Sequence, residues 1–178
     1  MNRSSEVGQS ASIYWNRAIR LQEPSAGTLR EELGFSLVTG VFSNGVFFSI
    51  GSNVVFRIAL GQELSDKTQV QAIGLALSSN FFRNAHVQTE EVGSLSVLGV
   101  QLPRDAQSVA NELRSKHPAK MSLSTEIDRW VIRYGDAFSL MFQPLGELAE
   151  DPRRSRSVFI EFSYGLPYTA RDLPTVSI

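Results

Sequence analysis

The segment from Phe35 to Leu60 constrains the fold more than any other part of the sequence. It reads FSLVTGVFSNGVFFSIGSNVVFRIAL and contains one charged residue, Arg57, and five of the eleven phenylalanines. Asn-Gly between alternating apolar runs is typical of a β-hairpin, because a tight type I′ turn needs positive φ at both central residues. A second turn signal, Gly-Ser-Asn, follows six residues later. The segment therefore predicts three antiparallel strands, near 35–42, 46–50 and 54–60.

The rest of the chain shows both periodicities of apolar residues. Alternation of period two predicts strands, and spacing of three and four residues predicts helices. The predicted strands are 13–21, 86–92, 94–102, two strands within 127–143 that form a hairpin, and 157–164. The predicted helices are one or two turns that follow Thr28, a helix over 67–79, and a helix over 104–116 that Pro118 ends.

These elements predict a mainly β protein, α+β by count. We expect an antiparallel β-sandwich, jelly-roll-like, with two helices on the connections between strands. The length of 178 residues predicts a single domain over 1–178. Residues 1–11 and 165–178 are polar or proline-bearing, and we expect them to be terminal arms that a partner orders.

Composition excludes several classes of protein. The chain has no cysteine, so disulfides, thiolate nucleophiles and cysteine metal sites are absent. A net charge of −1 gives no overall field that would attract nucleic acid or an acidic membrane. No apolar run reaches the length of a membrane helix, and the first ten residues lack the apolar core of a signal peptide. We therefore expect no membrane partner and a location in the cytoplasm or in a virion.

No motif in the sequence predicts catalysis, a cofactor or a metal site. The glycines have the spacing of hairpin turns and not that of phosphate-binding loops, and no nucleophile elbow surrounds any serine. The two histidines, His86 and His117, have no second ligand at metal-binding spacing. We therefore expect no catalytic, cofactor-binding or metal-ligating residues.

Two groups of residues remain as candidate contact sites. Arg153, Arg154 and Arg156 form the one dense basic stretch, which could contact nucleic acid or a neighbouring subunit, although a solvated loop explains it as well. Arg57 is the other candidate, a possible polar anchor, because the only charge in the apolar meander either projects outward or is paired. Glu161 and Asp136 are further candidate anchors for a ligand.

The order of elements resembles the single jelly-roll coat domains of small icosahedral RNA viruses. The segment AFSLMFQPLGELAEDPRRSRSVFIEFSYGLP, residues 137–167, is similar to the last strand pair of such domains, in which a polar loop joins two apolar strands before a terminal arm. The resemblance implies a shell-forming protein. Many such coats have a basic N-terminal arm for the genome, whereas residues 1–12 contain only Arg3. The resemblance therefore implies weak RNA binding at most.

The first interpretation is a non-catalytic structural protein that self-associates into a symmetric assembly, of the viral coat type, with itself as partner and RNA as a second candidate partner. The second interpretation is a small cytosolic ligand-binding module or enzyme with a pocket in the sandwich. The third is an adaptor that binds one other protein. The size of the purified protein in solution separates the first interpretation from the other two.

Overall fold

The structure is a computed structural model of the chain. It describes residues 2–34, 38–42, 45–51, 53–79, 81–82, 87, 89–126, 129–143 and 151–178. Its centre is an antiparallel sheet of eight strands in the order β1-β2-β3-β4-β10-β9-β8-β7. A three-stranded sheet in the order β11-β5-β6 lies apart from it. The prediction of a mainly antiparallel β protein is confirmed.

The predicted meander forms one wing of the large sheet. Its strands are β1 (Val38–Phe42), β2 (Gly45–Gly51) and β3 (Val54–Ile58). Phe42 pairs with Gly45, as a hairpin with a two-residue connection requires. The connecting residues 43–44 lie outside the described residues, and so does Ser52 in the second turn.

The other strands of the large sheet come from the second half of the chain, apart from β4. They are β4 (Ala72–Ala76), β7 (Met121–Glu126), β8 (Arg129–Tyr134), β9 (Phe138–Phe142) and β10 (Val158–Ser163). The predicted hairpin within 127–143 and the strand at 157–164 are confirmed as β8, β9 and β10. Strand β7 was missed, because its sequence, MSLSTE, has few apolar residues.

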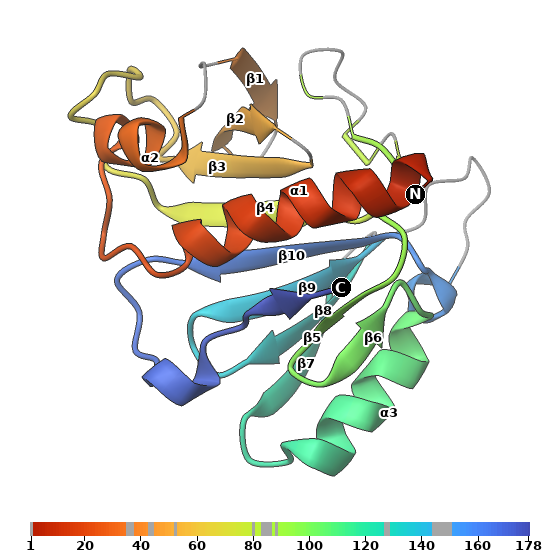
Figure 1. Ribbon diagram of the computed structural model, residues 1–178. Coiled ribbons are helices and arrows are strands. Elements are labelled where there is room, and N and C mark those ends of the chain that lie inside the picture. Colours follow the sequence, from red (N-terminus) through yellow and green to blue (C-terminus); the bar gives the residue numbers. More distant parts are fainter. Residues whose placement is uncertain are drawn as a thin grey trace.

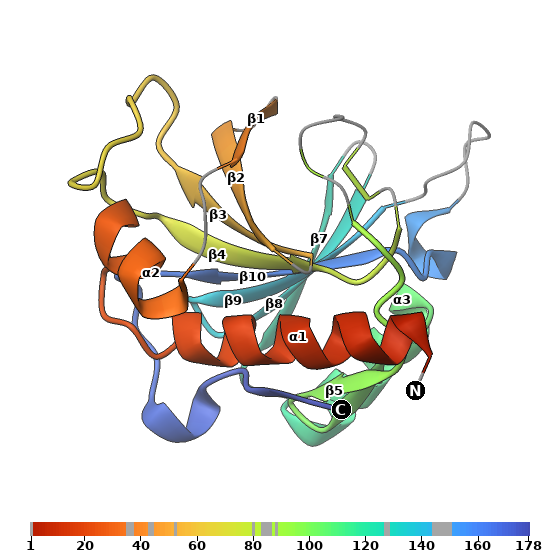
Figure 2. The ribbon, with the colours of Figure 1, turned by 45° about the horizontal axis from the view of Figure 1, so that its top comes forward.

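The helices lie on one face of the large sheet, which we call the covered face (Figures 1 and 2). Helix α1 (Arg3–Ala18) runs across it and contacts β3 and β4. Helix α2 (Ala26–Leu33) ends at Gly34, whose left-handed φ of 66° suits glycine. Helix α3 (Ala106–Lys116), with Asp105 as its N-cap, confirms the prediction for 104–116. The small sheet, β5 (Leu95–Val97), β6 (Val100–Leu102) and β11 (Val176–Ser177), lies on the same side.

The predicted strand at 13–21 is wrong, because α1 covers most of that range. The apolar residues Ile13, Trp15 and Ile19 fit an alternating pattern, but Ile13 is 52% exposed. The buried positions are instead spaced as in a helix, and they begin inside the segment that looked like a loose tail: Val7, Ala11, Trp15, Ala18 and Ile19.

The predicted helix over 67–79 is also wrong, because residues 72–76 form the central strand β4. Every residue of β4 is buried, on both faces of the sheet. A strand buried on both faces has a continuous apolar sequence, which periodicity alone does not separate from a buried helix. Its two alanines and its leucine have high helix propensity, and the tertiary environment overrides that preference.

The segment 86–102 also differs from its prediction. Its described residues before Leu95 are irregular, and 95–102 is a hairpin of two short strands with Leu98 and Gly99 at its turn. Both turn residues have positive φ, 54° and 76°, as in a type I′ turn. A non-glycine residue at the first turn position hid this hairpin from the sequence prediction.

Both expected terminal arms are parts of the folded structure. Residues 3–11 belong to α1, and the indole Nε1 of Trp15 donates a hydrogen bond of 2.8 Å to the carbonyl oxygen of Pro174. Nδ2 of Asn16 donates a hydrogen bond to the carbonyl oxygen of Val176, and Oδ1 of Asn16 accepts one from the backbone N–H of Val176, both at 2.8 Å. Val176 is 2% exposed. The two end segments therefore bind each other within the fold.

Candidate interaction surface

The face of the large sheet opposite α1, which we call the outer face, contains the candidate anchor Arg57. The guanidinium of Arg57 donates from Nε and Nη2 to the carboxylate of Glu161, at 3.5 and 3.2 Å, and from Nη1 to Oε1 of Gln71 at 2.7 Å. The side chains of Arg57 and Glu161 are only 24% and 19% exposed. Arg57 is thus paired, and the structure brings two of the three candidate anchors together.

The third candidate anchor, Asp136, is exposed in the turn between β8 and β9. Of the contacts that the structure describes, none joins Asp136 to Arg57. The polar anchors therefore do not form a three-residue set.

The Arg57–Glu161 pair crosses β4, because Arg57 on β3 lies beside Ala72, and Glu161 on β10 lies beside Gly74. The small side chain of Ala72 leaves room above the central strand for the two long side chains. Arg57 and Glu161 therefore join β3 to β10 across their common neighbour. Because each nitrogen of the guanidinium already has a bond to a side chain, the pair contributes to stability and does not offer a free cation.

An aromatic cluster, which we call the outer cluster, covers the same face next to this pair. Phe159 on β10 stacks on Phe81 with ring centroids 5.4 Å apart, and it meets Phe47 and Phe82 edge-to-face. Phe81 and Phe82 belong to the segment after β4, which folds back over the sheet. The outer face is thus partly covered by this segment, whereas the helices lie on the other side.

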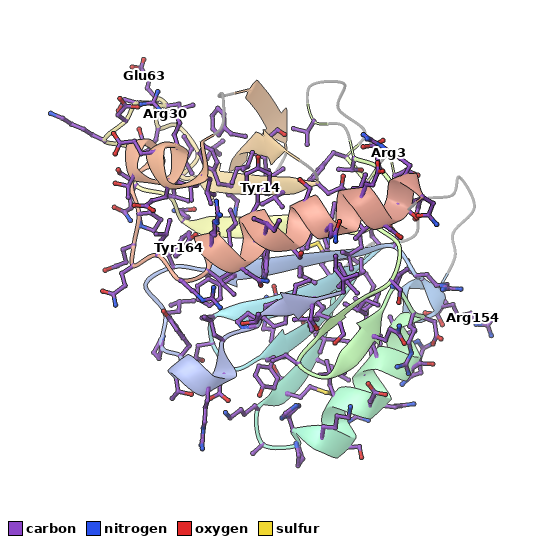
Figure 3. All side chains as sticks on the ribbon, viewed as in Figure 1. Arg3, Tyr14, Arg30, Glu63, Arg154 and Tyr164 are labelled. Atoms are coloured by element: carbon purple, nitrogen blue, oxygen red, sulfur yellow. The ribbon has the colours of Figure 1, made fainter. Side chains whose placement is uncertain are left out.

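The candidate basic residues lie in and after a short 3₁₀ helix (Pro152–Arg154). Arg153 binds the carboxylate of Asp151, with Nη2 at 2.8 Å from Oδ2, and this hydrogen bonding lowers the pKa of Asp151 and raises that of Arg153. Arg156 donates from Nη2 to the carbonyl oxygen of Pro103 at 3.1 Å. Arg154 is exposed and projects away from the fold (Figure 3). The structure therefore gives Arg153 and Arg156 different partners within the chain.

Sequence reasoning missed a polar cluster near the C-terminal end of α3. The ammonium of Lys120 lies 2.5 Å from Oδ2 of Asp172, which also accepts a hydrogen bond from the Thr169 hydroxyl. These bonds, led by that of Lys120, lower the pKa of the Asp172 carboxyl. The hydroxyl of Tyr134 lies 3.4 Å from Nδ1 of His117, and their rings meet edge-to-face.

This cluster joins the turn after α3 to the C-terminal segment. Its members come from three separate parts of the chain, so no spacing in the sequence could have revealed them together. Among the described residues, no three His, Asp or Glu side chains gather as a metal site would require. His86 lies outside the described residues.

The large sheet has two edges, β1 and β7, because these strands end the strand order. An edge strand directs alternate backbone N–H and C=O groups away from its one partner, where they can bind water or another strand. Strand β1, VTGVF, contains no charged residue and no proline, whereas β7 contains Glu126 and follows Lys120. Strand β1 therefore lacks two of the features with which proteins prevent edge pairing, charge and proline.

None of the helices in the described part of the chain is long and apolar enough to cross a membrane. The fold and these surfaces define a protein built on one antiparallel sheet with a helix-covered face. No protein-family model, no curated protein and no solved structure matches the chain.

Proposed function

We propose that this protein is a non-catalytic structural protein that self-associates into a symmetric assembly. The observation that carries the proposal is the uncharged edge strand β1 at one end of an eight-stranded sheet. Backbone hydrogen-bonding groups at such an edge are a template for a strand from another chain. Association at an edge extends the sheet without changing either fold.

The arrangement of the layers supports association at the edge of the sheet. Helices and the small sheet lie on the covered face, and the outer cluster with the Arg57–Glu161 pair occupies part of the outer face. The C-terminal segment is held against α1 by the hydrogen bond from Trp15 to Pro174. The edges of the large sheet are therefore surfaces of regular structure at which a second chain can add hydrogen bonds.

A more specific form of the proposal is a viral coat protein with jelly-roll topology, located in the cytoplasm or in a virion. It draws on the resemblance of residues 137–167 to the last strand pair of viral coat domains, and β9 and β10 do pair antiparallel there. The eight strands lie in one sheet, however, so the proposal of self-association rests on the edge strand and not on the jelly roll. In this role the exposed side chain of Arg154 would contact RNA.

Sedimentation velocity of the purified protein over a range of concentrations tests the proposal. We expect species heavier than the 19.7 kDa monomer at tens of micromolar, and a fraction of them that rises with concentration. If a nuclease-treated sample associates equally well, the contact is between protein chains and does not require nucleic acid. A strictly monomeric protein at every concentration would contradict the proposal and favour the ligand-binding alternative.

A further inference from the structure

We propose that β1 is the subunit contact and that it pairs antiparallel with β1 of a second copy, about a two-fold axis at Gly40. This inference rests on the proposed self-association and adds the surface, the register and the symmetry. The two large sheets would become one continuous sheet. The partner is a second copy of this chain.

The backbone of β1 determines which groups face the second copy. Phe42 and Gly45 close a two-residue connection, and the closing pair of such a hairpin exchanges hydrogen bonds. Alternation along the strand then directs the backbone groups of Gly40 and Val38 toward β2 as well. Thr39 and Val41 direct their N–H and C=O groups away from β2. Within the described part of the chain no strand pairs with this side of β1, so these four groups can bind a second strand.

The sequence of β1 matches itself under a two-fold rotation about Gly40. In that pairing Gly40 faces Gly40, Thr39 faces Val41, and Val38 faces Phe42 of the second copy. Each non-glycine pair joins β-branched or aromatic residues, which are the types that stabilise cross-strand pairs. No like charges oppose each other. A self-complementary edge of this kind favours a closed dimer, because a two-fold contact uses the same surface on both chains.

The alternative use of this edge is pairing with β7, the edge at the other end of the sheet. Such a head-to-tail contact forms a ring if the rotation closes and a filament if it does not. Strand β7 ends at Glu126, and in an antiparallel match this charge finds no complement on the uncharged β1. The two-fold β1 contact is therefore the arrangement that the edges favour.

A pair of double variants tests the register. Positions 38 and 42 are chosen because they stand opposite Ser49 and Gly45 on β2, whereas Thr39 stands opposite the buried Phe48. Val38→Lys with Phe42→Lys places like charges opposite each other across the axis. Val38→Lys with Phe42→Glu places opposite charges there and changes the same two positions.

We expect the first double variant to weaken dimerisation by roughly tenfold or more at low salt, and the second to restore most of it. Equal loss in both variants would overturn the register. Unchanged association in the first variant would overturn the contact while leaving self-association intact. A wild-type protein that is monomeric throughout would instead contradict the proposed function itself.

Hydrogen exchange on the wild-type protein keeps the inference testable if a variant fails to fold. The outward-facing backbone amides of Thr39 and Val41 should exchange more slowly at concentrations at which the protein associates than at high dilution. Amides of Met121–Glu126 on β7 serve as the matched control and should exchange equally at both concentrations. Slowing in β7, or no slowing in β1, would overturn the inference.

Discussion

The ring of Phe159 on β10 occupies the space directly above Gly74 on β4. A Cβ atom built on Gly74 would lie 2.1 Å from Cζ of Phe159, far inside van der Waals contact. Gly74 therefore serves a packing purpose, because its own backbone conformation does not require glycine.

We predict that Gly74→Ala destabilises the protein by about 1–3 kcal/mol, because the ring must leave its position against Phe81. In a Phe159→Leu background the same substitution should cost much less, since the obstructing ring is gone. Denaturant unfolding of the four proteins in this cycle measures both effects. Equal costs in the two backgrounds would show that the ring does not lie over Gly74.

The Arg57–Glu161 pair should contribute measurably to stability. We expect a double-mutant cycle with Arg57→Met and Glu161→Gln to give a coupling energy of about 1 kcal/mol, because both side chains are mostly shielded from water. The Arg3–Glu90 pair, with side chains 72% and 50% exposed, is the matched control, and its coupling should lie near zero in salt. Similar couplings for the two pairs would contradict the difference in burial.

The N-cap of α3 should make stability depend on pH. Oδ2 of Asp105 accepts the backbone N–H of Ser108 at 2.9 Å, and this bond leads the interactions that lower the pKa of Asp105. A lowered carboxyl pKa stabilises the fold above the unfolded value, about 4, and that contribution is lost as the pH falls through the folded value.

We predict that Asp105→Ala costs about 1 kcal/mol at neutral pH. Asp105→Asn should keep most of the cap and remove its part of the acid sensitivity. Thermal melts of both variants from neutral pH to acid check this. If Asp105→Asn loses stability in acid as steeply as the wild type, Asp105 does not contribute to that slope.

Helix α3 buries one face against the rest of the fold. Leu113 is 1% exposed, so Leu113→Ala should cost about 2–4 kcal/mol. Ser115, which is exposed on the same helix, is the control, and Ser115→Ala should change stability by less than about 0.5 kcal/mol. Comparable losses of stability in the two variants would show that the face of α3 assigned to the core is wrong.

The C-terminal segment should be needed for a stable monomer. Deleting residues 174–178 removes the acceptor of the Trp15 indole, both partners of Asn16, and the buried Val176. We therefore expect a clearly lower melting temperature. Deleting only Ile178, which is 63% exposed, should have little effect. A truncated protein as stable as the full chain would show that this segment is a free arm after all.

The sequence was sufficient where local signals agree with the tertiary structure. The meander near Asn44 and the helix near Leu113 were predicted because turn chemistry and periodicity pointed to the same elements. Strand β4 was not, because burial on both faces erases alternation. Helix α1 was not predicted either. Ile13 completed an alternating apolar pattern that is typical of a strand, but its side chain is exposed and does not belong to the buried face.

The candidate contact sites also differ in how far the sequence predicted them. The isolation of Arg57 in an apolar segment indicated that it would be paired or exposed, and the fold selects the pair with Glu161, 104 residues away. The cluster of Lys120 and Asp172 left no trace in the sequence, since its members meet only through the fold. Long-range polar contacts depend on topology, which local patterns do not contain.

The bond between Trp15 and Pro174 has a consequence for the synthesis of the protein. The two residues are 159 positions apart, so at ribosomal rates of about 5–20 residues per second they are separated by roughly 10–30 s. Throughout that interval α1 lacks β11, although β3 and β4, which it also contacts, are made earlier. A nascent chain must therefore hold α1 with part of its apolar side uncovered until its last strand is made.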